Sequence, residues 1–121
     1  MTEGIGIDIC EISRMEKLKD PERFAARFFS DEEREYINGK GAGRAQTMAG
    51  LFAAKEALGK AAGGGLDFEL REAGVAHDEA GRPFFRFTGK AAERFGGKNV
   101  LLSITHDGGY AAAVCIMEEK Q

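Results

Sequence analysis

The stretch from Ala45 to Ala62 constrains the fold most, because it is a long helix pattern with an abrupt end. It is rich in Ala, Leu, Met, Lys and Glu, which all favour the helical state. A run of three glycines at 63–65 then ends the helix. The predicted core positions share one face of this helix: Met48, Leu51, Leu58 and Ala62.

Residues 4–10 read Gly-Ile-Gly-Ile-Asp-Ile-Cys and alternate with a period of two, which predicts a half-buried strand. Ile5, Ile7 and Ile9 share one face. The opposite face carries two glycines, Asp8 and Cys10, so that a carboxylate lies on a surface without bulky side chains. The glycines leave room there for a bulky partner to approach.

Three short helices are predicted between these two elements. The first covers residues 11–18, and the second covers 21–29 and begins at an Asp-Pro pair. The third begins at a Ser30–Glu33 capping box and ends at Gly39. Residues 39–44 are predicted to be a flexible loop. The second half is predicted to be mostly strand, at 73–77, 83–87, 100–106 and 110–117, with a short helix from Thr88 to Phe95. We therefore expect an α/β (α+β) fold in one domain, residues 1–121, with a small antiparallel-rich sheet packed on helices.

Composition excludes several classes of protein. The net charge of -3 gives no basis for nucleic-acid binding, and no apolar run approaches the roughly 20 residues of a membrane span. We therefore expect a cytoplasmic protein without a membrane partner. Cys10 and Cys115 lack metal-site spacing and lie in apolar strand patterns, so we expect them to be buried and reduced.

Three residues are candidates for chemistry, and each has an ordinary alternative. Asp8 is either a functional carboxylate or a solvent-facing edge-strand residue. Glu56 and Lys60 have the spacing of a common surface helix pair, although Lys60 also precedes a glycine turn that could cradle phosphate. The helix dipole opposes anion binding at that end, so Lys60 would have to overcome it.

Two further features have the same ambiguity. His106 lies near the end of a strand, where it is either a structural residue or a donor to a phosphate. The segment 14–27 has a local excess of two positive charges, which is either a solvated helix face or a landing site for an acidic partner.

Four motifs, in order along nearly the whole chain, resemble one family, the holo-acyl-carrier-protein synthases among the 4′-phosphopantetheinyl transferases. The first two are Gly4-Ile-Gly-Ile-Asp8 with Glu11 and Arg14, and Arg23-Phe-Ala-Ala-Arg27-Phe. The third is Phe52-Ala-Ala-Lys-Glu56-Ala-Leu-Gly-Lys60-Ala. The fourth is Leu102-Ser-Ile-Thr-His106 followed by Tyr110-Ala-Ala-Ala-Val.

The resemblance implies a homotrimer of 4′-phosphopantetheinyl transferase fold, with active sites between neighbouring subunits. It implies transfer of phosphopantetheine from coenzyme A to a serine of acyl carrier protein, in fatty acid biosynthesis. Asp8 and Glu56 match the magnesium ligands, and both are expected to serve catalysis together with Lys60. The residues expected to contact coenzyme A are Lys60, Gly63, Gly65, Arg82, Pro83, Thr105 and His106. Those expected to dock the carrier protein are Arg14, Arg23 and Arg27.

The implied chemistry agrees with what the residues can do. Mg²⁺ typically takes one or two carboxylates together with substrate phosphates and water. Lys60 would stabilise the departing 3′,5′-ADP, and either Glu56 or a metal-bound water would accept the proton of the serine.

The chain departs from the family pattern at three places. Leu51 replaces a common arginine, Gly59 replaces a serine, and the loop after Lys60 is short. Leu51 favours an alternative, a non-catalytic module that binds coenzyme A or carrier protein. A second alternative is a structural oligomer in which both carboxylates are merely exposed.

Overall fold

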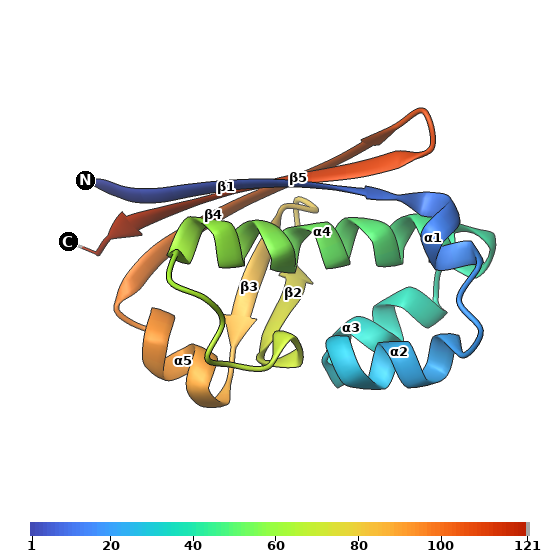
Figure 1. The fold of residues 1–121 in the computed structure, drawn as a ribbon, viewed down its shortest axis with the longest axis horizontal. Coiled ribbons are helices and arrows are strands. Elements are labelled where there is room, and N and C mark those ends of the chain that lie inside the picture. Colours follow the sequence, from blue (N-terminus) through green and yellow to red (C-terminus); the bar gives the residue numbers. More distant parts are fainter. Residues whose placement is uncertain (121) are drawn as a thin grey trace.

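The computed structural model describes residues 1–120 and has a mixed α+β architecture with antiparallel sheets, as the sequence predicts (Figure 1). The strands are β1 (Thr2–Glu11), β2 (Ala73–His77), β3 (Pro83–Phe87), β4 (Lys98–Asp107) and β5 (Tyr110–Glu119). The helices are α1 (Ile12–Glu16), α2 (Pro21–Phe28), α3 (Asp31–Asn38), α4 (Arg44–Ala62) and α5 (Gly89–Phe95). Among residues 1–120 no helix combines the length and the apolar character that a membrane span requires.

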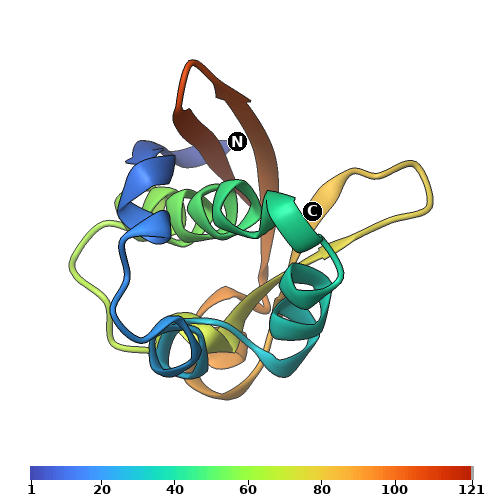
Figure 2. The same cartoon turned by 90° about the vertical axis from the view of Figure 1, so that its right-hand side faces the viewer.

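Two antiparallel sheets frame the fold. The larger has the strand order β1-β5-β4, so the two ends of the chain lie side by side. The smaller is the β2–β3 hairpin, whose turn at residues 78–81 is held by the Asp78 carboxylate, which accepts the N–H groups of Ala80 and Arg82. Seen end-on, this turn extends away from the body of the molecule (Figure 2). Both strands of the hairpin have the bounds predicted from the sequence.

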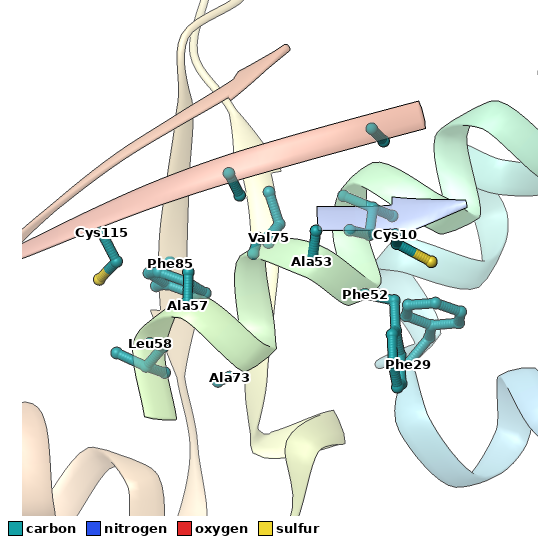
Figure 3. Close-up of a cluster of buried hydrophobic side chains, with 14 of the residues drawn as sticks. Cys10, Phe29, Phe52, Ala53, Ala57, Leu58, Ala73, Val75, Phe85 and Cys115 are labelled. Atoms are coloured by element: carbon teal, nitrogen blue, oxygen red, sulfur yellow. The ribbon is translucent and has the colours of Figure 1, made fainter. Parts of the chain in front are cut away.

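Helix α4 lies between the large sheet and the remaining elements (Figure 1). Most of its residues are buried, including the predicted core residues Met48, Leu51 and Leu58. The aromatic side chains of Phe29 and Phe52 pack at one end of this core, and Leu58 packs with Cys115 and Phe85 at the other (Figure 3). The central position of α4 explains why its sequence is apolar on more than one side.

Strand β1 contacts α4 directly through backbone. A Cβ atom added at Gly4 would overlap the carbonyl oxygen of Ala61, and one at Gly6 would overlap that of Ala57. The bulky partner that approaches the glycine face of β1 is therefore α4 itself.

The isoleucines of β1 lie on the opposite face, and this face is open. Ile5, Ile7 and Ile9 are 65%, 66% and 63% exposed. The strand register places Ile116 beside Ile5 and Val114 beside Ile7, and Leu101 lies on the other side of Ile116. The β1 strand is thus half-buried as expected, but its glycine face is the buried one. An open apolar sheet face of this kind indicates a surface that another molecule covers.

The short helices begin at the predicted caps. Asp20 accepts the N–H of Arg23 at the start of α2, and Ser30 and Glu33 form a complete capping box at the start of α3. Residues 39–44 depart from the prediction of a flexible loop, because Gly41–Gly43 form a turn of 3-10 helix that leads directly into α4.

Candidate functional site

Asp8 and Lys60 meet where β1 crosses α4. The Lys60 ammonium donates to Asp8 Oδ1 at 3.1 Å and to the carbonyl oxygen of Ile7 at 3.0 Å. The Asp8 side chain is 20% exposed and that of Lys60 56%, so the pair lies at the edge of the buried layer. Lys60 therefore pairs with the strand carboxylate, and the ordinary helix pair with Glu56 is not among the ion pairs of residues 1–120.

Glu56 lies one turn before Lys60 on α4 and is half-buried. Its charge, with those of Asp8 and Glu11, raises the pKa of the Cys10 thiol, although burial is the largest cause and Arg14 opposes it. Asp8 and Glu56 therefore both lie within electrostatic range of Cys10 on the inner face of β1. Cys10 itself is a free, buried thiol, as expected.

The carboxylates of Asp8 and Glu56 are suited to a hard divalent ion that keeps several coordination positions open to other ligands. Asp8 and Glu56 supply two carboxylates, and a lysine ammonium already sits on one of them. Within residues 1–120 no group of three or more His, Cys, Asp or Glu side chains is placed to hold a metal. Two carboxylates alone leave most of the six coordination positions of Mg²⁺ to water and substrate oxygens.

Other predicted site residues lie on the far flank of α4. His106 and Pro83 line a cavity of about 350 Å³, together with Gly50 and Leu51 of α4. Leu51 and Glu56 are five residues apart, which is roughly 140° around a helix. The predicted site is thus divided into two parts within one chain, with α4 between them.

The cavity on that flank also contains residues that sequence reasoning missed. Gln46 contacts His106 through their side-chain nitrogens at 3.2 Å. The rings of Tyr36 and His77 stack with 4.4 Å between centroids, and Lys40 lies over Tyr36. These residues come from α3, the turn that follows it, β2 and the start of α4, and no spacing in the sequence signals their approach.

Thr105 and Arg82 do not line this cavity. Thr105 is exposed on the open outer face of the large sheet, because neighbouring residues of a strand point to opposite faces. Arg82 is exposed in the turn between β2 and β3, where its backbone is fixed by Asp78. A contact with coenzyme A at either residue stays a prediction.

The glycine loop after α4 is tied to α5 by Arg94, another residue that the sequence did not single out. Its guanidinium donates to the carbonyl oxygens of Gly63 and Gly65 at 2.9 Å each. The N–H of Gly63 already donates to Gly59 O. The loop is therefore held through its carbonyls, and Gly63 has no free N–H with which to cradle a phosphate.

The three candidate docking arginines lie on α1 and α2. Arg14 lies over the ring of Phe52 at 5.2 Å, and Arg27 lies over that of Phe28 at 5.1 Å. Arg23 is exposed near the start of α2. None of the three lines the cavity that His106 lines. Arg14 and Arg27 lie over neighbouring rings, because the centroids of Phe52 and Phe28 are 5.6 Å apart.

A buried ion pair supports the whole arrangement. Lys55 and Glu33 are fully buried and joined at 2.7 Å, and the Lys55 ammonium also donates to the carbonyl oxygens of Leu70 and Ala73. Burial lowers the pKa of Lys55, and the Glu33 charge opposes that shift. Because Lys55 precedes Glu56, this pair fixes the rotation of α4 next to a predicted metal ligand. The capping box was visible in the sequence, but the second role of Glu33 was not.

Comparisons with known proteins agree on one family. The model of the 4′-phosphopantetheinyl transferase superfamily matches residues 4–115. A holo-acyl-carrier-protein synthase of Treponema denticola is 47% identical, over 98% of this chain and 99% of its own.

Solved structures of synthases give the same result. The enzyme of Neisseria meningitidis has a TM-score of 0.87 and 32% identity, and the match covers 98% of this chain and all of that one. That of Bacillus anthracis, in complex with CoA (3′,5′-ADP), has a TM-score of 0.84 and 35% identity over 99% of both chains. The resemblance in the four motifs is thereby confirmed, and the chain belongs to the holo-acyl-carrier-protein synthases of the 4′-phosphopantetheinyl transferase superfamily.

Proposed function

We propose that this protein transfers 4′-phosphopantetheine from coenzyme A to a serine of apo acyl carrier protein, in a reaction that depends on Mg²⁺. The products are the holo carrier protein and 3′,5′-ADP. One observation supports the proposal above the others: Asp8 and Lys60, far apart in sequence, meet at 3.1 Å beside the helix turn that bears Glu56. The expected setting is cytoplasmic fatty acid biosynthesis.

The residues at the β1–α4 crossing divide the chemistry among them. Asp8 and Glu56 would hold the ion, which when bound offsets negative charge on the phosphoryl oxygens. The serine oxygen forms a bond to the phosphorus that bears pantetheine, and the bond to the bridging oxygen breaks. Glu56 accepts the serine proton, and Lys60 stabilises the departing 3′,5′-ADP.

We also propose that each complete site is shared between protomers of a homotrimer. In one chain the carboxylates and His106 lie on different flanks of α4, so a neighbouring copy would supply the missing half. The open apolar face of β1, β5 and β4 provides the surface for that association. The threefold number follows from the family resemblance.

The deciding experiment is a mass measurement on the carrier protein. Apo carrier protein incubated with the protein, coenzyme A and Mg²⁺ should gain one phosphopantetheine. Glu56→Gln should lower the rate by about 100-fold or more, because Gln cannot accept a proton and is a weaker metal ligand. Glu35→Gln on the exposed side of α3 is the matched control and should keep the rate.

The same experiment tests the alternative of a non-catalytic module. Leu51 favours it, because it is 2% exposed and lines the cavity without offering a charge. No mass gain under saturating substrate, with coenzyme A still bound, would establish the binding module and reject the transferase. An unchanged rate in Glu56→Gln would reject our assignment of Glu56 and favour the structural alternative.

A further inference from the structure

The C-terminal end of α4 opposes the binding of an anion at Lys60. Lys60 lies in the last turn of this helix, where unpaired carbonyl groups create a partial negative charge. The Lys60 ammonium is directed away from those carbonyls, because it donates to Asp8 and to the carbonyl oxygen of Ile7 on β1. An anion at Lys60 is therefore favoured by a second cation that acts on the helix end itself.

Arg94 of α5 is this second cation. Figure 1 shows α5 below the end of α4, with the glycine loop between them. Arg94 Nη2 donates to the carbonyl oxygen of Gly63, the C-cap residue of α4, at 2.9 Å. Arg94 also lines a cavity with Ala61 and Ala62 of the last helical turn. The guanidinium thus offsets the partial negative charge at the end of α4.

Arg94 also restricts the glycine loop. Gly63, Gly64 and Gly65 have φ angles of 69°, 66° and 81°, and a run of glycines can adopt many other conformations. Arg94 Nη1 donates to the carbonyl oxygen of Gly65 at 2.9 Å, so one guanidinium joins both ends of the run. This restriction lowers the conformational entropy that is lost when a ligand binds beside the loop.

The charge of Arg94 is fixed in place and only partly compensated. The guanidinium lies 5.3 Å from the ring centre of Phe95 and 5.9 Å from that of Phe68, and both rings are buried. Its one carboxylate partner among residues 1–120 is Asp67, at 2.8 Å. The Asp67 side chain is 76% exposed and that of Arg94 24%, so water and salt screen the carboxylate more than the cation.

We propose that Arg94 is a positioning residue for the diphosphate of coenzyme A. It offsets the negative end of α4 and orders the glycine loop, so that Lys60 can hold the diphosphate and then the departing 3′,5′-ADP. This inference rests on the proposed function. Asp67 moderates the effect, because it compensates part of the Arg94 charge.

Calorimetric titration with coenzyme A and Mg²⁺, without carrier protein, tests the role of the charge. Arg94→Met should raise the Kd by about fivefold or more, and Asp67→Asn should lower it by about twofold. The two changes have opposite signs because one removes the cation and the other removes its compensation. Arg94→Lys should restore most of the affinity. Lys90→Met, which removes a positive charge elsewhere on α5, should bind as wild type does.

Steady-state kinetics provide a second readout. Arg94→Met should raise KM for coenzyme A by the same factor and change kcat by less than about twofold, since the diphosphate is charged in both the ground state and the transition state. An equal fall in kcat with an unchanged KM would overturn the proposal. Weaker or unchanged binding by Asp67→Asn would also overturn it, and this holds even if Arg94→Met does not fold.

The titration separates this proposal from the proposed function, because it requires no transfer. The opposite shifts of Arg94→Met and Asp67→Asn in a protein that transfers nothing would refute the transferase and keep the role of Arg94. Transfer by wild type with unchanged coenzyme binding in Arg94→Met would keep the transferase and refute the role of Arg94.

Discussion

At the scale of single residues, chemistry-bearing side chains in this chain have two kinds of environment. Asp8, Glu56 and Lys60 are partly exposed and so can reach a substrate. Cys10 and Cys115 are buried and free. The sequence predicted both groups, because alternation in a strand and glycine neighbours are local signals. It did not predict Lys40 or His77, whose positions depend on contacts between elements far apart in the chain.

Cys115 gives the protein a defined dependence of stability on alkaline pH. Burial raises the pKa of its thiol from 9.0 to about 11. The folded state therefore holds this proton more tightly than the unfolded state. The corresponding stability is fully present below pH 9 and is lost as pH rises through 11, a total of about 2 to 3 kcal/mol.

Urea unfolding of wild type and Cys115→Ala between pH 8 and pH 11 checks this expectation. Wild type should lose more free energy of unfolding over that range than the variant, while lysine and tyrosine titration affects both alike. Parallel decreases in the two proteins would show that the thiol does not contribute.

At the scale of elements, the crossing of β1 and α4 positions the proposed metal ligands. The helix and the strand were each predicted from the sequence, within about two residues at their ends. Their packing was not, because the exposed isoleucines of β1 have the periodicity of a core face. Local pattern cannot distinguish a face buried within the chain from one covered by another copy.

Gly6→Ala should disrupt this crossing. The new Cβ would overlap the Ala57 carbonyl and lie 2.7 Å from the N of Ala61, both of them backbone atoms of a packed helix. We expect a loss of about 1 to 3 kcal/mol in unfolding free energy, with a fall in transfer rate as β1 moves away.

The matched control is Gly97→Ala. A Cβ at Gly97 meets no heavy atom within 4 Å, and its backbone is not in the left-handed region. Denaturant unfolding should show this variant close to wild type. Equal stability of Gly6→Ala and Gly97→Ala would mean that β1 and α4 can separate without cost.

At the scale of the whole molecule, the proposed association of copies would explain both the open sheet face and the divided site. Ile7 is at the middle of the exposed β1 face. Ile7→Asp would bury a charge in that interface and should convert the oligomer to a monomer. Lys90→Asp on α5, away from the sheet, should leave the assembly intact.

Light scattering after size-exclusion chromatography measures both variants. If sites are shared, monomeric Ile7→Asp should also lose most of its transfer activity while its circular dichroism remains that of a folded protein. A monomeric wild type with full activity would show that one chain holds a complete site.

The contact of Gly4 and Gly6 with the carbonyls of α4 has a consequence for how this protein tolerates sequence change. Where Gly4 and Gly6 face Ala57 and Ala61, strand and helix approach so closely that peptide backbone lies against peptide backbone. Mutations elsewhere in the core can be accommodated by changes of side-chain rotamer. We expect such changes to leave the distance between the carboxylates of Asp8 and Glu56 unaltered. We therefore expect the distance on which the proposed ion binding depends to change little as the surrounding sequence varies.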